Sequence, residues 1–161
     1  MYCIYNDQEL SSRMAAGVVM KYAIEQGFIR TVDFVPWNYT KSLPVLEKGR
    51  RVIMIGVTFL VGEMYGIKDI SNGEFVWISH HTGDVLRLLA NKGPAYCKPV
   101  IPEVTTFKLD GKKMYTVHSE SVAELTFEYY YPTLEVPKFI KWIGWYDTGK
   151  YEHEDNANEI R

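Results

Sequence analysis

The chain has 161 residues, of which 47% are hydrophobic and 24% are charged, with a net charge of −2 and a pI near 6.1. This length predicts one globular domain whose core needs no metal or disulfide support. The weak negative charge argues against broad nucleic-acid binding through a basic surface. No apolar run reaches the roughly 20 residues of a membrane span, and the start lacks a signal peptide. Because two cysteines suit a reducing compartment, we expect a cytoplasmic protein without a membrane segment.

The first half of the chain predicts alternating strands and helices. Asn6, three residues before Glu9, indicates a capping-box start for a helix that runs to about Gly27. The continuous apolar run that ends at Gly56 is typical of a central parallel strand. The strands expected in this half are residues 2–5, 31–35, 51–55 and 75–78, and a second, weak helix is expected at 61–70.

The second half predicts a helix that begins near Gly83, then two strands between 104 and 117 about the turn Asp110-Gly111. A helix follows at 121–131, and the last helix begins at Pro137. This order predicts an α/β fold with a doubly wound, mainly parallel sheet flanked by helices, in a single domain with a small β-hairpin insertion. We assign residues 1–150 to that domain and 151–161 to an acidic C-terminal tail.

Two adjacent histidines, His80 and His81, follow the apolar strand at 75–78 and precede a Thr-Gly turn. Ligands of α/β sheets bind outside the carboxyl ends of the strands. We therefore expect these imidazoles at a ligand-binding edge. The alternative, two turn histidines without a ligand, stays open.

Five segments occur in a characteristic order along almost the whole chain. They are Asn6-Asp7-Gln8-Glu9, Val52-Ile53-Met54-Ile55-Gly56, Val76-Trp77-Ile78-Ser79-His80-His81, Ala123-Glu124-Leu125-Thr126-Phe127-Glu128-Tyr129 and Ile143-Gly144-Trp145-Tyr146-Asp147. In this order and spacing the chain resembles the N-terminal domain of the DHH phosphoesterase superfamily. Members are manganese-dependent hydrolases of pyrophosphate, short oligonucleotides or cyclic dinucleotides, and most carry a second domain that holds the substrate.

The resemblance implies that part of the family's metal site is kept. Asp7 matches the first aspartate of the family pattern, Glu9 stands for the second, and Asp147 matches the last. The two histidines of the Asp-His-His motif are present as His80 and His81.

Two acids of the family pattern are replaced. Gly56 stands where the family has the aspartate that bridges both metals, and Ser79 replaces the aspartate of Asp-His-His. Two divalent cations a few ångströms apart repel each other strongly unless anionic ligands lie between them. We therefore expect no hydrolytic dinuclear centre and no cofactor. A single weak cation, such as Mn²⁺, remains conceivable, because three carboxylates and one imidazole form a plausible ligand set.

The expected ligand-binding residues are Asp7, Glu9, Arg13, Ser79, His80, His81 and Asp147, and the ligand set of the single cation would be Asp7, Glu9, His80 and Asp147. Each residue also has a plainer interpretation. Acidic residues in the first turn of a helix are favoured by the macrodipole whatever the function. Asp147 before Thr148-Gly149 could simply close a turn, and Arg13 could be an exposed helix residue.

Aromatic residues crowd the last third of the chain, namely Tyr129, Tyr130, Tyr131, Trp142, Trp145, Tyr146 and Tyr151. Helical spacing can bury only some of them, so we expect the rest on the surface, where tyrosine and tryptophan anchor protein partners or stack on bases. The alternative is that they cap a core.

The leading hypothesis is a catalytically inactive, DHH-phosphoesterase-like protein that acts by binding. It would sequester a nucleotide or cyclic-nucleotide-like ligand, or inhibit a protein partner through the C-terminal aromatic face, as a phage-encoded anti-defence factor in the host cytoplasm. One alternative is a weak single-metal phosphoesterase acting on nucleotides or short oligonucleotides. Another is a structural subunit of an assembly, and a homo-oligomer is compatible with each.

Overall fold

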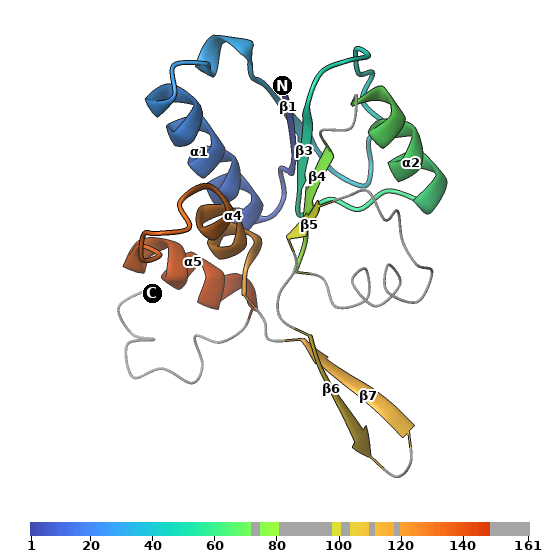
Figure 1. Ribbon diagram of the computed structural model, residues 1–161, viewed down its shortest axis with the longest axis vertical. Coiled ribbons are helices and arrows are strands. Elements are labelled where there is room, and N and C mark those ends of the chain that lie inside the picture. Colours follow the sequence, from blue (N-terminus) through green and yellow to red (C-terminus); the bar gives the residue numbers. More distant parts are fainter. Residues whose placement is uncertain (72–74, 81–97, 101–103, 110–111, 118–119, 149–161) are drawn as a thin grey trace.

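The computed structural model describes residues 1–71, 75–80, 98–100, 104–109, 112–117 and 120–148. Helices lie between β1 and β2 and between β3 and β4, and two more follow β7 (Figure 1). The elements are β1 (Tyr2–Asn6), α1 (Leu10–Glu25), the 3-10 helix η1 (Ile29–Thr31), β2 (Asp33–Trp37), β3 (Val52–Ile55), α2 (Val61–Ile70), β4 (Phe75–Ile78), β5 (Lys98–Val100), β6 (Val104–Leu109), β7 (Lys112–Val117), α4 (Val122–Tyr130) and α5 (Lys138–Thr148). The helix predicted near Gly83 and the acidic tail at 151–161 lie outside the described residues.

Five strands form one parallel sheet in the order β2-β1-β3-β4-β5. β1 lies between β2 and β3, so Ile4 is paired with Val35 on one side and with Met54 on the other. Strands β6 and β7 form a separate antiparallel pair, which projects from the end of the sheet (Figure 1). The predicted doubly wound α/β fold with a small hairpin insertion is therefore confirmed.

The strand residues alternate between two cores, because successive side chains of a strand point to opposite faces of the sheet. On one face, Cys3, Ile53 and Val76 pack against side chains of α1 and α4. On the other face, Met54 and Trp77 pack in a second core, which also contains residues of α2. Burial on both faces explains why β3 and β4 are continuous apolar runs.

Helices cover both faces of this sheet. Figure 1 places α1, α4 and α5 on one side and α2 on the other. Helix α4 begins at a capping box, in which Ser121 Oγ accepts the N–H of Glu124 and the Glu124 carboxylate accepts the N–H of Ser121. In the part of the chain that the structure describes, no helix has the length and apolar character needed to cross a bilayer.

The predicted start of the first helix is wrong. Asn6 belongs to β1, where it is paired with Trp37, and its Oδ1 accepts the N–H of Gln8 at 3.1 Å. Helix α1 begins at Leu10, and its N-cap residue is Glu9, which makes no side-chain capping bond. The sheet register therefore overrides the local capping signal, because Asn6 is held extended by its neighbour in β2.

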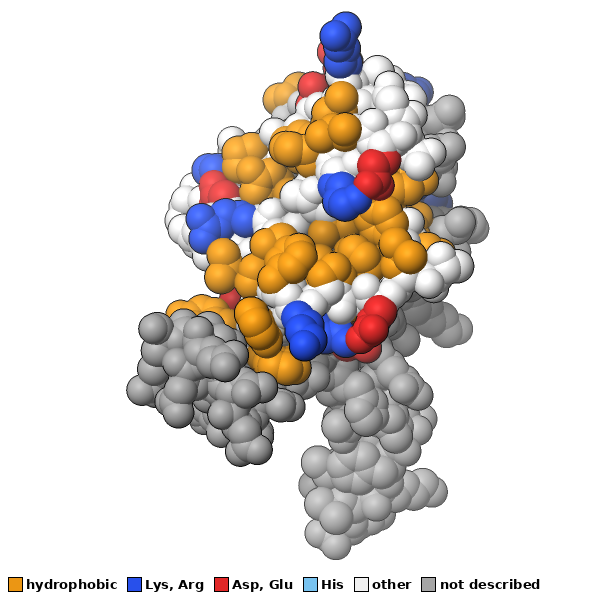
Figure 2. Space-filling model, turned by 90° about the vertical axis from the view of Figure 1, so that its left-hand side faces the viewer, with side chains coloured by type: hydrophobic (Ala, Val, Ile, Leu, Met, Phe, Trp, Pro, Cys, Tyr) orange, Lys and Arg blue, Asp and Glu red, His pale blue; other side chains and the backbone are white. Residues whose placement is uncertain are grey.

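The aromatic side chains of the last third divide between core and surface, as expected. Tyr130 is buried beside Tyr22, with ring centroids 4.6 Å apart, whereas Tyr146 is 57% exposed. Figure 2 shows apolar side chains spread over the face that α1 and α5 present to solvent. Exposed apolar residues of these helices include Met20, Ile24, Phe139 and Tyr146. Tyr151 lies outside the described residues.

Candidate functional site

The candidate site lies where the strand order of the sheet reverses. From β1 the chain continues to β2, which is the neighbour of β1 on one side in the sheet. The next strand, β3, is the neighbour of β1 on the other side. In doubly wound sheets, ligands bind in the crevice at the carboxyl ends of two such strands. Here those ends are followed by Asp7 to Glu9 after β1 and by Gly56 after β3.

Gly56 closes tightly against the start of α1. Its φ angle is +61°, and a Cβ atom at this position would lie 2.0 Å from Ser12 Oγ and 2.9 Å from Glu9 Oε2. Ser12 Oγ in turn donates to Glu9 Oε2 at 2.8 Å. Glycine is favoured here, because a side chain would be strained at this positive φ and would displace Ser12 and Glu9. We call Glu9, Ser12 and Gly56 the cleft cluster.

A cleft of about 580 Å³ opens beside this cluster. Its lining residues are Gln8, Glu9, Leu10, Arg13, His80, Tyr146 and Asp147. The structure thus brings together four of the predicted site residues, from the loop after β1, from α1, from the end of β4 and from α5. Carboxylates, an imidazole, a guanidinium and an exposed phenol ring meet in one space.

Asp147 fixes α5 to the beginning of α1. Its Oδ2 accepts the N–H of Ser11 at 2.7 Å, one of the helix N–H groups that have no partner within α1. The N-terminal end of a helix favours a negative charge, so this contact is electrostatically favourable as well. The plainer interpretation of Asp147, that it closes a turn, is wrong, because the residue lies in the last turn of α5.

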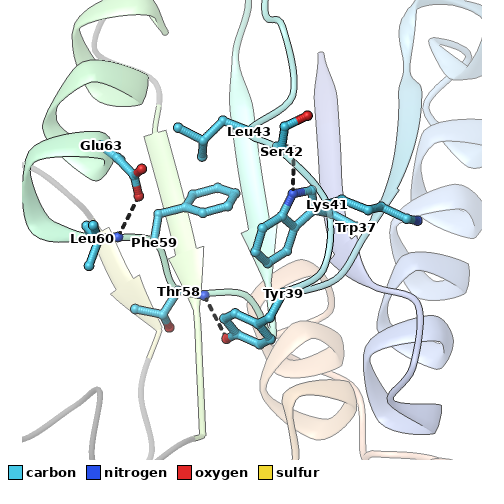
Figure 3. A pocket seen from close by; sticks show the side chains of 9 residues that line it. All are labelled: Trp37, Tyr39, Lys41, Ser42, Leu43, Thr58, Phe59, Leu60 and Glu63. Carbon is cyan, nitrogen blue, oxygen red and sulfur yellow. Dashed lines mark hydrogen bonds between the residues drawn. The ribbon is translucent and has the colours of Figure 1, made fainter.

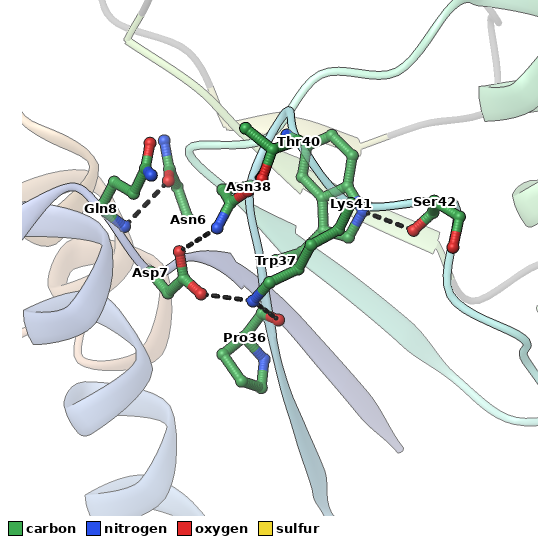
Figure 4. A network of polar contacts seen from close by, with 9 residues as sticks. All are labelled: Asn6, Asp7, Gln8, Pro36, Trp37, Asn38, Thr40, Lys41 and Ser42. Carbon is green, nitrogen blue, oxygen red and sulfur yellow. Dashed lines mark hydrogen bonds and ion pairs between the residues drawn. The ribbon is translucent and has the colours of Figure 1, made fainter.

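Asp7 does not line this cleft. Lys41 Nζ lies 2.5 Å from Asp7 Oδ2, and Asn38 Nδ2 donates to Asp7 Oδ1 at 2.8 Å (Figure 4). Both hydrogen bonds lower the pKa of the Asp7 carboxyl, and the one from Lys41 has the larger effect. Asp7 is therefore an ionised group that the loop after β2 already neutralises.

The remaining predicted residues are placed as follows. Ser79 is fully buried, His80 is half-buried at the cleft, and His81 lies outside the described residues. Within the described residues, no three side chains of His, Cys, Asp or Glu are gathered closely enough to hold a metal ion. Of the ligand set predicted for a single cation, Glu9, His80 and Asp147 line the cleft, whereas Asp7 is held by Lys41 outside it.

Sequence reasoning missed three features of the cleft. Tyr146 was assigned to an aromatic face and not to the ligand site, although it directly precedes Asp147. Ser12 carried a usable signal, because a residue three positions after Glu9 lies on the same side of a helix. Gln8 and Leu10 line the cleft because they flank the N-cap of α1, which is a consequence of the tertiary fold.

Comparisons with known proteins found no relative. No protein-family model, no curated protein and no solved structure matches this chain. The likeness to the DHH phosphoesterases accordingly stays a prediction from the residues quoted above.

Proposed function

We propose that this chain is a catalytically inactive, DHH-phosphoesterase-like protein that binds a nucleotide-like ligand in the cleft. The observation that carries the proposal is the cleft cluster. The space in which a strand carboxylate at position 56 would lie is filled by Ser12 and Glu9. Ser12 and Glu9 would have to move before a bridging acid fitted there, and Asp7 is paired with Lys41; both observations support a centre without two metals.

The cleft nonetheless offers groups that suit binding. The Arg13 side chain is exposed, and a guanidinium binds phosphate through paired hydrogen bonds. The exposed ring of Tyr146 provides a surface on which a base can stack. The acids Glu9 and Asp147 accept hydrogen bonds from Ser12 and Ser11, which reduces the repulsion that they exert on an anion. Arg13 and Tyr146 thus favour a small phosphate-bearing aromatic ligand.

A protein partner is the second candidate, and the apolar surface favours it. Phe139 and Tyr146 are both more than half exposed on α5, and Leu134 is exposed just before this helix. Large exposed side chains of this kind are common at protein interfaces. A partner bound there would cover one rim of the cleft, since Tyr146 belongs to both surfaces.

The test is a binding and turnover assay with pyrophosphate, a cyclic dinucleotide and a short oligonucleotide, each with and without Mn²⁺. We expect at least one probe to raise the melting temperature, because a ligand that binds only the folded state stabilises it, and we expect no turnover. Arg13→Ala should weaken that binding at least tenfold. Arg30→Ala is the matched control, because Arg30 is also exposed but lies in η1.

Two results would contradict the proposal. Turnover that Mn²⁺ supports and His80→Ala abolishes would establish the weak phosphoesterase instead. Failure of every probe to bind would remove the nucleotide-like ligand, and capture of a partner that Phe139→Ala prevents would then support the second candidate.

A further inference from the structure

A second pocket, of about 720 Å³, lies near the carboxyl ends of β2 and β3 and beside α2 (Figure 3). Its lining residues are Trp37, Tyr39, Lys41, Ser42, Leu43, Thr58, Phe59, Leu60 and Glu63. We call it the aromatic pocket, and we propose that it binds a planar heteroaromatic ring that carries an N–H donor, such as an aminopurine. None of its lining residues belongs to the cleft, so the inference is independent of the proposed function.

Three aromatic rings build the wall of this pocket. The Trp37 ring meets the Phe59 ring edge-to-face, with centroids 4.7 Å apart and planes at 79°, and it meets the Tyr39 ring at 5.1 Å and 74°. Trp37 and Phe59 are buried, whereas Tyr39 is 59% exposed. Aromatic rings attract one another in stacked and edge-to-face arrangements. A flat ring that enters the pocket can therefore lie against Tyr39 while its edge meets the buried rings.

Hydrogen bonds hold these rings in place before any ligand arrives. The Trp37 indole N–H donates to the carbonyl of Ser42 at 2.9 Å, and the Thr58 N–H donates to the Tyr39 hydroxyl at 3.4 Å (Figure 3). The second bond joins the loop after β2 to the loop after β3. A wall that is fixed by its own bonds binds a ligand with less loss of conformational freedom.

The polar groups of the pocket indicate which hydrogen-bonding groups the edge of the ligand's ring should carry. Lys41 Nζ is directed to Asp7 and to the carbonyl of Pro36, away from the pocket (Figure 4). Glu63 is half-buried and accepts the N–H of Leu60 through Oε2 at 2.9 Å. The charge on the pocket wall is thus that of a carboxylate, which favours a ligand with an N–H donor over a phosphate.

Thr58 supplies an independent observation. The residue is 9% exposed, and its hydroxyl is shielded from water without a hydrogen-bond partner among the described residues. Buried polar groups in folded proteins are nearly always hydrogen-bonded, so an isolated hydroxyl in a pocket wall indicates a missing partner. Because the hydroxyl is shielded from solvent, a ring nitrogen or amino group would become its partner only after the Thr58 side chain turns toward the pocket.

The rim of the pocket is apolar and open to solvent. Leu43 and Leu60 are exposed there together with Tyr39. Large apolar side chains that converge at the mouth of a pocket are typical of ligand sites, because the ligand covers them on binding. The pocket therefore has a buried aromatic wall, a polar recognition edge and an apolar rim.

The experiment measures binding of adenosine and purine riboside by calorimetry and by amide chemical shifts. Adenosine carries the exocyclic amino group, whereas the base of purine riboside has no N–H donor, and neither carries a phosphate. We expect adenosine to bind more tightly than purine riboside, and Tyr39→Ala to weaken adenosine binding at least tenfold. Tyr39→Phe should restore most of the affinity, since it keeps the ring. Tyr65→Ala is the matched control, because Tyr65 is an exposed tyrosine of α2 outside both pockets.

A further variant keeps the test independent of folding effects. Glu63→Gln is expected to fold normally and to reduce the preference for adenosine over purine riboside, while Arg30→Ala, outside both pockets, should leave adenosine binding unchanged. Adenosine binding that is insensitive to Tyr39→Ala, or shifted amides confined to the cleft, would overturn the inference, as would a folded wild-type chain that binds neither nucleoside. Because the probes lack phosphate, these results do not bear on ligand binding by Arg13 in the cleft.

Discussion

Two parts of the molecule each combine a serine, a glutamate and a glycine, but they use these residues in different ways. In the cleft cluster, a Ser12–Glu9 hydrogen bond of 2.8 Å lies against Gly56. Where α4 meets α5, a Ser121–Glu124 hydrogen bond of 2.8 Å lies against Gly144, whose Cβ would be 2.6 Å from Ser121 Oγ and 2.3 Å from Glu124 Oε2. We call Ser121, Glu124 and Gly144 the capping cluster.

The difference lies in what the carboxylate does. Glu124 is the third residue of its helix and accepts the N–H of Ser121, so its charge completes a capping box. Glu9 precedes its helix, makes no side-chain capping bond, and lines the cleft beside Arg13. The same trio therefore serves helix stability in one place and places an acid at the cleft in the other. The glutamate precedes the serine along the chain in the cleft cluster, whereas the serine precedes the glutamate in the capping cluster. This order separates the two roles.

Gly56→Ala tests the cleft cluster and should have the largest effect. The left-handed conformation costs an L-residue about 1–2 kcal/mol, and the added methyl must displace Ser12 Oγ, which costs about 1 kcal/mol more in lost hydrogen bonding. We expect the free energy of unfolding to fall by about 2–3 kcal/mol, measured by urea denaturation.

Gly17→Ala is the control for this substitution. Gly17 lies exposed in α1 with nothing within 4 Å of the added Cβ. Alanine should stabilise the helix there by about 0.5–1 kcal/mol. Equal effects of the two substitutions would show that position 56 is not sterically closed, and the main support for an inactive centre would be lost.

The sequence was sufficient to predict four of the five strands of the sheet, because their apolar residues carry the signal. It missed β5, because Pro99 indicates a break in regular structure, although proline is tolerated in an edge strand such as this one. Met54 and Trp77 face one core while Ile53 and Val76 face the other, and burial on both faces requires unbroken apolar runs. The turn signal Asp110-Gly111 likewise placed β6 and β7 correctly, although the turn itself lies outside the described residues.

The site was less predictable, because its chemistry depends on which partner each acid meets. Asp7 and Glu9 are two residues apart, yet one is bound by Lys41 from the loop after β2 and the other by Ser12 in α1. Asp147 meets Ser11 across 136 positions of the chain. No local pattern encodes such distant pairings, and the aromatic pocket was missed because Trp37 ends β2 whereas Phe59 lies in the loop after β3.

The capping cluster allows a double-mutant cycle with smaller effects. Ser121→Ala should cost about 1 kcal/mol, since it removes an N-cap hydroxyl. Gly144→Ala should cost a similar amount, roughly 1 kcal/mol, because the methyl forces Ser121 and Glu124 apart. In the double variant the cap is already lost, so the combined cost should fall short of the sum by about 1 kcal/mol. Additive costs, measured by urea denaturation, would show that Gly144 does not act through the cap.

The smallest expected effect concerns charge around the capping cluster. Desolvation, and then repulsion from Glu120 and Glu124, raise the pKa of Glu128. A raised pKa means that the folded chain binds the proton more tightly than the unfolded chain. The ionised carboxylate therefore destabilises the fold at neutral pH, and this penalty disappears as the pH falls through the folded pKa and below the ordinary glutamate value. Glu128→Gln should thus stabilise the protein at pH 7 by at most about 0.5 kcal/mol, because the side chain is exposed.

The control is Glu135→Gln, which removes an exposed pair with Lys141 and should give no gain at pH 7. Thermal melts of both variants between pH 4 and pH 7 provide the measurement. A Glu128→Gln advantage that stays constant or grows toward low pH would contradict the assignment, because only a charge penalty of the folded state vanishes on protonation.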